Sequence, residues 1–125
     1  MGIKMAKRLL IVDDEETLTF SLYQSFIHSH NDYEVITAGT GEEALEKINQ
    51  KPFDLIVTDI FMPGISGLEV LEKVKETHPE TKVIIMTAYG SEEHKENALG
   101  KGAVHYIEKP FDIKEFKKLV MKILE

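Results

Sequence analysis

Residues 54–71 read DLIVTDIFMPGISGLEVL, and this stretch decides the fold. The apolar residues at 55–57 are consecutive instead of alternating, which is typical of a parallel strand covered by helices on both faces. Pro63 and Gly64 mark a loop, and Leu68 and Leu71 begin a helical spacing after it. A strand that passes through a short loop into a helix is the repeating unit of an α/β domain.

The rest of the chain repeats this unit. We expect strands at 9–12, 34–38, 55–58, 82–87 and 104–107, and helices at 17–29, 41–50, 67–78, 92–100 and 113–125. Five such units, joined by right-handed crossovers, predict an open, doubly wound, flavodoxin-like parallel sheet flanked by five helices. Sheets of this kind bind ligands beyond the carboxyl ends of their strands, so the functional site is expected there.

Length and composition limit the function classes. The 125 residues, 42% of them hydrophobic, fit one domain spanning 1–125. A formal net charge of -7 repels phosphate backbones, so we expect no direct nucleic-acid binding. The chain has no cysteine, which excludes a zinc-thiolate site and a thiol nucleophile. No apolar run is long enough to cross a bilayer, and we expect a cytoplasmic protein without a membrane partner.

Polar side chains follow four of the expected strands. Asp13 and Asp14 follow the first, Asp59 the third, Thr87 the fourth and Lys109 the fifth. Any one of them alone is an ordinary cap or turn residue, so the prediction depends on the joint pattern. Three carboxylates in one crevice repel one another unless a cation is present. Oxygen ligands without a Cys or His cluster favour Mg²⁺, or Mn²⁺ in its place, over zinc.

This set of groups suits phosphoryl transfer. The charge on the moving group must be neutralised by cations and hydrogen-bond donors, which a metal, Lys109 and Thr87 supply. Asp59 is the candidate nucleophile because it stands alone at the end of a central strand, and a carboxylate nucleophile gives an aspartyl phosphate. No residue is an evident base for hydrolysis.

Four segments carry a resemblance to a known family: LLIVDDEE (9–16), DLIVTDIFMPGISGLEVL (54–71), VIIMTAYG (83–90) and YIEKPFD (106–112). Together they resemble the receiver domain of bacterial two-component response regulators. The phrases VIIMTAYG (83–90) and KPFDI (109–113) especially resemble single-domain phosphorelay receivers of the sporulation type, although related runs occur in the receivers of multidomain transcriptional activators. The resemblance implies the strand order 2-1-3-4-5 and phosphorylation of Asp59 with Mg²⁺.

The resemblance also implies roles for individual residues. Asp13 and Asp14 match the metal-binding pair, with Asp14 the direct ligand, and the backbone carbonyl of Phe61 is the third protein ligand. Thr87 matches the switch hydroxyl, Tyr106 the aromatic switch, and Lys109 the lysine that pairs with the phosphoryl oxygens. A cis peptide is implied before Pro110.

The family further implies partners. We expect the phosphodonor to be a phosphohistidine on a histidine kinase or phosphotransfer protein with a helical bundle, docking at the first helix and the crevice loops. A downstream partner would read the face of the fourth helix, fifth strand and fifth helix. We expect the domain to catalyse its own phosphorylation and slow autodephosphorylation without being a turnover enzyme. We expect no output domain within these residues, so the output is supplied by another molecule or belongs to a part separated from this domain, and of these we favour a stand-alone protein.

Two alternatives compete with this interpretation. Residues 39–44, GTGEEA, match G-x-G-x-x-A, a dinucleotide fingerprint, but Glu42 and Glu43 place carboxylates where a pyrophosphate would bind. The alternative of a Mg²⁺-dependent aspartyl phosphatase calls for a second acid two residues after the nucleophile, where this chain has Phe61. We also expect Phe61 and Tyr89 to flank the path of attacking water and to prolong the life of the aspartyl phosphate.

Overall fold

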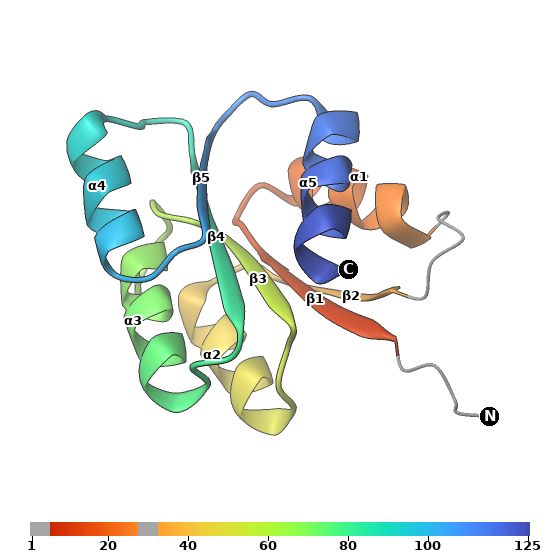
Figure 1. Ribbon diagram of the computed structural model, residues 1–125, viewed down its shortest axis with the longest axis horizontal. Helices are drawn as coiled ribbons and strands as arrows, with labels where there is room; N and C mark the ends of the chain where they lie inside the picture. The colour runs from red at the N-terminus through yellow and green to blue at the C-terminus, as the bar shows by residue number, and fades with distance from the viewer. Residues whose placement is uncertain (1–5, 28–32) are drawn as a thin grey trace.

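The computed structural model describes residues 6–27 and 33–125, in which strands and helices alternate (Figure 1). The strands are β1 (Lys7–Val12), β2 (Tyr33–Ala38), β3 (Leu55–Asp59), β4 (Lys82–Thr87) and β5 (His105–Glu108). The helices are α1 (Glu16–Ile27), α2 (Gly41–Gln50), α3 (Gly67–Thr77), α4 (Glu92–Gly100) and α5 (Ile113–Leu124).

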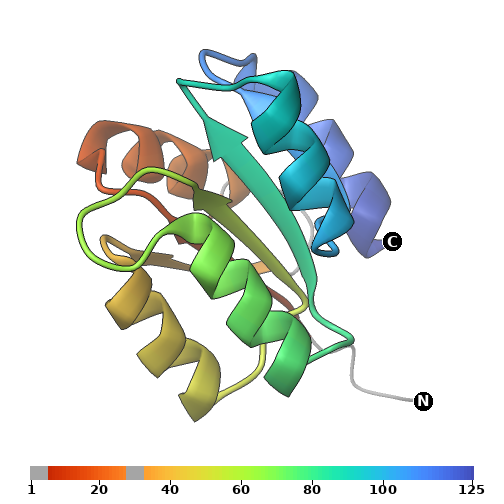
Figure 2. The same ribbon diagram turned by 90° about the vertical axis from the view of Figure 1, so that its left-hand side faces the viewer.

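The five strands form one parallel sheet in the order β2-β1-β3-β4-β5, which confirms the predicted fold. Helices α1 and α5 cover one face, and α2, α3 and α4 cover the other (Figures 1 and 2). The order of strands reverses between β1 and β3, so their carboxyl ends border the crevice where such sheets bind ligands.

Burial on both faces explains the consecutive apolar residues of the central strands. In β1, Leu10 and Val12 belong to the core under α2, α3 and α4, whereas Leu9 and Ile11 belong to the core under α1 and α5. All four are fully buried. Every residue of β3 is buried as well, which places Asp59 at the end of a rigid, solvent-excluded strand.

Four helices begin at a polar side chain that caps them. Thr40, Ser66 and Ser91 each accept a hydrogen bond from the amide three residues onward, at the starts of α2, α3 and α4. Asp112 accepts from the amides of Lys114 and Glu115 at the start of α5. These caps fix where each helix leaves the loop at the carboxyl edge of the sheet.

The predicted boundaries differ from the observed ones by one or two residues at several ends. β1 begins at Lys7, because Lys7 and Arg8 pair with Tyr33 and Glu34 of β2 although they are polar. β5 is displaced by one residue, α1 begins at Glu16, α3 ends at Thr77 and α5 ends at Leu124. The predicted end of the first helix, 28–29, lies outside the described residues. In the described part, no helix is long and apolar enough to span a bilayer.

Candidate functional site

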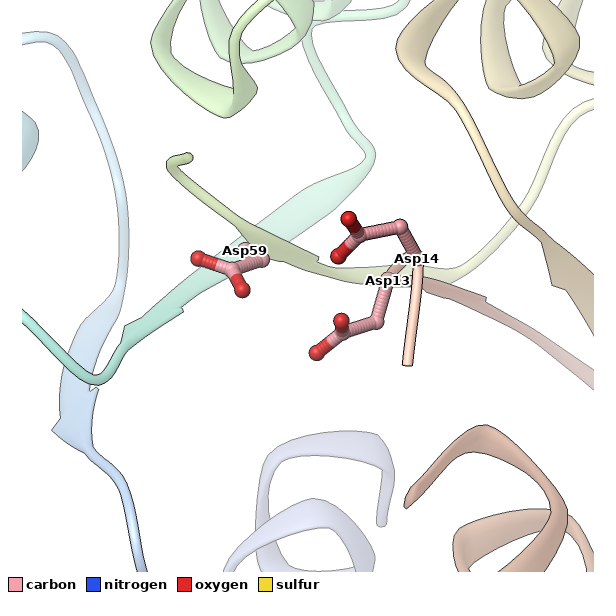
Figure 3. Close-up of side chains that lie close together, drawn as sticks. All are labelled: Asp13, Asp14 and Asp59. Atoms are coloured by element: carbon pink, nitrogen blue, oxygen red, sulfur yellow. The ribbon is translucent and has the colours of Figure 1, made fainter. Parts of the chain in front are cut away.

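Three carboxylates meet at the carboxyl ends of β1 and β3. Asp13 and Asp14 follow β1, Asp59 is the last residue of β3, and one oxygen from each lies within 4.8 Å of the others. Figure 3 shows the Asp13 and Asp14 carboxylates directed toward the side of the site where Asp59 lies. Asp13 and Asp59 are buried and Asp14 is exposed, so the group opens to solvent on the Asp14 side. The structure thereby brings together the three acids that the sequence predicted as metal ligands.

Lys109 supplies a positive charge to the same place from the loop after β5. Its Nζ lies 2.5 Å from Oδ2 of Asp13, 2.8 Å from Oδ2 of Asp59 and 2.9 Å from Oε1 of Glu15. The main chain holds the loop, since the Lys109 amide donates to the Thr87 carbonyl at 2.9 Å. The peptide bond between Lys109 and Pro110 is cis, as the resemblance implied.

The electrostatics of this cluster are those of a buried, charge-rich site. Desolvation by burial raises the pKa of Asp13, and the hydrogen bond from Lys109 offsets part of that rise. Desolvation lowers the pKa of Lys109, but its hydrogen bonds to Asp13, Asp59 and Glu15 outweigh this and leave the pKa raised. Lys109 is therefore a permanent cation at neutral pH. One ammonium among four nearby carboxylates leaves the site with an excess of negative charge that favours a divalent cation.

Local backbone contacts orient Asp59. Its Oδ1 accepts a hydrogen bond from the Phe61 amide at 3.1 Å, while Oδ2 faces Lys109. The chain then returns toward the strand, because the Gly67 amide donates to the Ile60 carbonyl at 2.9 Å. A Cβ at Gly67 would overlap the carbonyl of Asp59, so only glycine lets α3 begin this close to Asp59. Sequence reasoning missed this role of Gly67.

Thr87 and Tyr106, the predicted switch pair, lie on neighbouring strands. Thr87 is fully buried at the end of β4, and its hydroxyl accepts a hydrogen bond from the Tyr89 amide at 3.2 Å. Tyr106 on β5 is half-buried against the α2–α4 core, and its hydroxyl is buried without a hydrogen-bond partner. A switch that moves these two groups stays a prediction, as does the Phe61 carbonyl as a ligand.

Aromatic side chains pack against one another in the loops that follow β3 and β4. The Phe61 ring packs edge-on against Tyr89, with centroids 6.1 Å apart, and against His94 of α4, 5.3 Å apart. Phe61 is 44% exposed and Tyr89 is 75% exposed, so both rings lie on the surface. The contact with His94, which links the loop after β3 to α4, was not predicted from the sequence.

Residues 39–44, which match the dinucleotide fingerprint, form the start of α2, and side chains of this chain already accept hydrogen bonds from its amides. The Glu43 carboxylate accepts from the Gly39 amide at 2.7 Å, and the Glu43 amide donates to the Thr40 hydroxyl at 3.0 Å. The Glu42 carboxylate lies 3.4 Å from the Ile65 amide. Carboxylates therefore lie where a dinucleotide would need its pyrophosphate, which argues against the dinucleotide alternative.

Comparison with known proteins identifies the family. A family model described as the response regulator receiver domain matches residues 9–121. The chain belongs to this family. Receiver domains are the phosphoacceptors of two-component response regulators, they interact with histidine kinases or phosphotransfer proteins, and they generally use Mg²⁺, with which the acidic cluster is compatible.

Two curated receiver proteins from Bacillus subtilis (strain 168) illustrate the range of relatives. Sporulation initiation phosphotransferase F is 34% identical over 120 residues, covering 96% of this chain and 95% of that protein. The alkaline phosphatase synthesis transcriptional regulatory protein PhoP is 38% identical over 120 residues, covering 96% of this chain but 49% of that protein. This receiver domain therefore spans nearly all of the first relative and about half of the second.

Solved structures agree with the sheet order and helix placement. A CheY-like response regulator receiver domain protein from Methanospirillum hungatei JF-1 superposes with a TM-score of 0.84 at 37% identity, covering 95% of this chain and 94% of that one. The chemotaxis response regulator CheY4 of Vibrio cholerae gives a TM-score of 0.86 at 28% identity, with 95% and 99% covered.

Proposed function

We propose that Asp59 of this receiver domain accepts the phosphoryl group. The observation that carries the proposal is the position of Lys109, whose ammonium contacts the Asp59 carboxylate at 2.8 Å in a largely buried site. A carboxylate oxygen of Asp59 forms the new bond to phosphorus. The bond from phosphorus to the donor atom breaks, and its electron pair leaves with the donor, an imidazole nitrogen of phosphohistidine or the acetate of acetyl phosphate.

Four oxygen ligands would hold Mg²⁺: the carboxylates of Asp13, Asp14 and Asp59 and the backbone carbonyl of Phe61. Mn²⁺ has the same preference for oxygen ligands. The bound cation would neutralise charge on the phosphoryl oxygens. Lys109 contributes a fixed positive charge at the same place, and its three donors can pair with those oxygens. The excess of carboxylate charge in the cluster supports the fit of a cation.

The readout is proposed to pass from Thr87 to Tyr106. Thr87 ends β4, the strand that pairs with β3 and Asp59. Its hydroxyl accepts a hydrogen bond from the Tyr89 amide, and water or a shifted loop could replace the hydroxyl as the acceptor for that amide. A phosphoryl oxygen competes for that hydroxyl. Movement of Thr87 and Tyr106 shifts a pre-existing equilibrium, which a partner reads on the face of α4, β5 and α5.

The donor is proposed to be a phosphohistidine on a helical-bundle kinase or phosphotransfer protein in the cytoplasm. Phe20 and Ile27 of α1 are 61% and 41% exposed, which gives α1 apolar positions for such a partner to contact. Docking beside α1 would bring a donor to the open, Asp14 side of the acids. Nucleic acid has no part in this proposal, because the net charge is -7.

Incubation with Mg²⁺ and acetyl phosphate, followed by intact mass and site mapping, tests the proposal. We expect one phosphoryl adduct on Asp59 and none in Asp59→Asn. Turnover of the donor with little adduct would point instead to an aspartyl phosphatase. An adduct that persists in Asp59→Asn would show that another residue is the acceptor. Replacing Mg²⁺ with Mn²⁺ is expected to support the reaction, and chelation of both ions to stop it.

A further inference from the structure

Glu15 is a contact of Lys109 that lies outside the three-carboxylate group. The ammonium of Lys109 has three donors, and Asp13, Asp59 and Glu15 take one each. The first two acceptors have side chains that are 0% and 8% exposed, whereas that of Glu15 is 61% exposed. A phosphoryl oxygen that pairs with Lys109 must therefore displace one of three carboxylates that differ greatly in burial.

The main chain and the side chain of Glu15 make separate contacts. Its amide donates to Oδ1 of Asp13 at 2.9 Å, and its carboxylate accepts from Lys109 at 2.9 Å. Asp13 in turn accepts from Lys109 through Oδ2, which closes a ring of three residues. Because the amide contact needs no side chain, a substitution at Glu15 can remove the carboxylate while Asp13 keeps its backbone donor.

Of the three carboxylates that pair with Lys109, that of Glu15 costs the least free energy to displace. An exposed carboxylate regains its hydration when it leaves an ammonium, whereas a buried carboxylate left without its partner is strongly disfavoured. While it remains, the Glu15 charge also repels an incoming phosphodonor, which is itself an anion.

We propose that the Glu15 carboxylate is a positioning group that holds Lys109 toward the site between phosphorylation events and yields its place to a phosphoryl oxygen. It restrains entry of anionic donors into the site. This inference rests on the proposed roles of Asp59 and Lys109. Glu15 does not touch the reacting atoms and acts through Lys109 alone.

The test compares Glu15→Gln with Glu16→Gln. The two variants remove the same charge from adjacent positions, and in the described part of the chain Glu16 has no ion pair with Lys109. At saturating Mg²⁺ and low acetyl phosphate, we expect Glu15→Gln to be phosphorylated about two- to fivefold faster than Glu16→Gln. The faster rate should come from a lower apparent KM for acetyl phosphate, and the difference between the two variants should become smaller at high salt.

A second variant and a spectroscopic measurement separate positioning from a general structural effect. Glu15→Ala, which removes the acceptor altogether, is expected to be at least as fast as Glu15→Gln. The ammonium resonance of Lys109 should shift in both Glu15 variants and stay in place in Glu16→Gln. A Glu15→Gln rate no higher than that of Glu16→Gln, or an unshifted Lys109 resonance, overturns the inference. Absence of any adduct on Asp59 in the wild-type protein would instead refute the proposed function.

Discussion

The Lys109 ammonium lies 2.8 Å from Oδ2 of Asp59, although the two residues are 50 positions apart. Lys109 also contacts Asp13, at a separation of 96 positions. One side chain from the loop after the edge strand β5 thus crosses to the ends of β3 and β1, at the centre of the sheet. The third contact of Lys109 is with Glu15. These three contacts set the charge balance of the site and help to attach the loop after β5 to it.

Replacing Lys109 with Met is expected to lower the free energy of unfolding by about 2–3 kcal/mol without divalent cations, because Asp13 and Asp59 are left buried and unpaired. Urea denaturation measures the loss. Lys118→Met, which removes only an exposed pair with Glu115, is the control and should change stability little. If the carboxylates bind Mg²⁺, added Mg²⁺ should restore part of the lost stability. Unchanged stability in Lys109→Met would show that the three contacts are not formed in solution.

Opening the aromatic pair beside the site is expected to speed dephosphorylation. Phe61→Asn combined with Tyr89→Ala removes two rings whose centroids lie 6.1 Å apart, each two residues after Asp59 or Thr87. We expect the aspartyl phosphate to decay about tenfold faster, since water gains access to the phosphorus. Loss of the adduct is followed by intact mass after donor removal. Phe20→Ala, which truncates an exposed ring on α1, should leave the lifetime unchanged. Equal lifetimes in the wild-type protein and the double variant would exclude a shielding role.

Adding a methyl group at Gly90 is expected to displace the Tyr106 ring. A Cβ at Gly90 would lie 2.6 Å from the Tyr106 hydroxyl oxygen, so the ring or the loop must move. Such crowding costs about 1–3 kcal/mol. Fluorine NMR of fluorotyrosine-labelled protein reports the change in the Tyr106 environment.

The matched control is Gly100→Ala, where an added Cβ meets nothing within 4 Å at the end of α4. This variant should keep the Tyr106 resonance and hold or raise stability, because alanine favours helix over glycine. An unshifted Tyr106 signal in Gly90→Ala would mean that the ring does not occupy the position next to Gly90.

The start of α2 is expected to make stability depend on pH through Glu43. The hydrogen bond from the Gly39 amide, aided by Lys47, lowers the pKa of Glu43 below its ordinary 4.5. A carboxyl whose pKa is lowered by folding stabilises the protein above its unfolded pKa, and this contribution is lost as the pH falls through the folded value. At pH 7, Glu43→Gln should therefore cost about 0.5 kcal/mol.

The same substitution should cost little at a pH below the folded pKa of Glu43, where the carboxyl is protonated in both the folded and the unfolded states. Chemical denaturation at the two pH values gives the difference, and Glu46→Gln on the same helix is the control. A cost that is equal at both pH values would show that the charge of Glu43 contributes nothing.

The sequence predicted the sheet and most of the site because both follow from local patterns. Consecutive apolar residues identified the buried strands, and polar residues directly after them fixed Asp13, Asp14, Asp59 and Lys109 at one edge. Contacts that depend on side-chain length or on close packing had no such signal. The reach of Glu15 to Lys109 and the nearness of Gly67 to the Asp59 carbonyl become visible only when the loops are placed in space.

The predicted start of β1 was wrong because polar residues extend this strand beyond its apolar run. Arg8 is a charged residue that flanks the apolar run. Its side chain nevertheless donates to the Pro52 carbonyl, lies over the Phe53 ring and pairs with Glu34. These partners come from β2 and from the chain before β3, so only tertiary contacts place Arg8 in β1.

The first and last contributors to the site, Asp13 and Lys109, are 96 residues apart and meet through a single ion pair. A chain emerging from the ribosome therefore contains Asp59, the proposed acceptor, long before it contains Lys109. Competence to take a phosphoryl group should arise late, once β5 has joined the edge of the sheet, so labelling with a phosphodonor also reports that the sheet is complete.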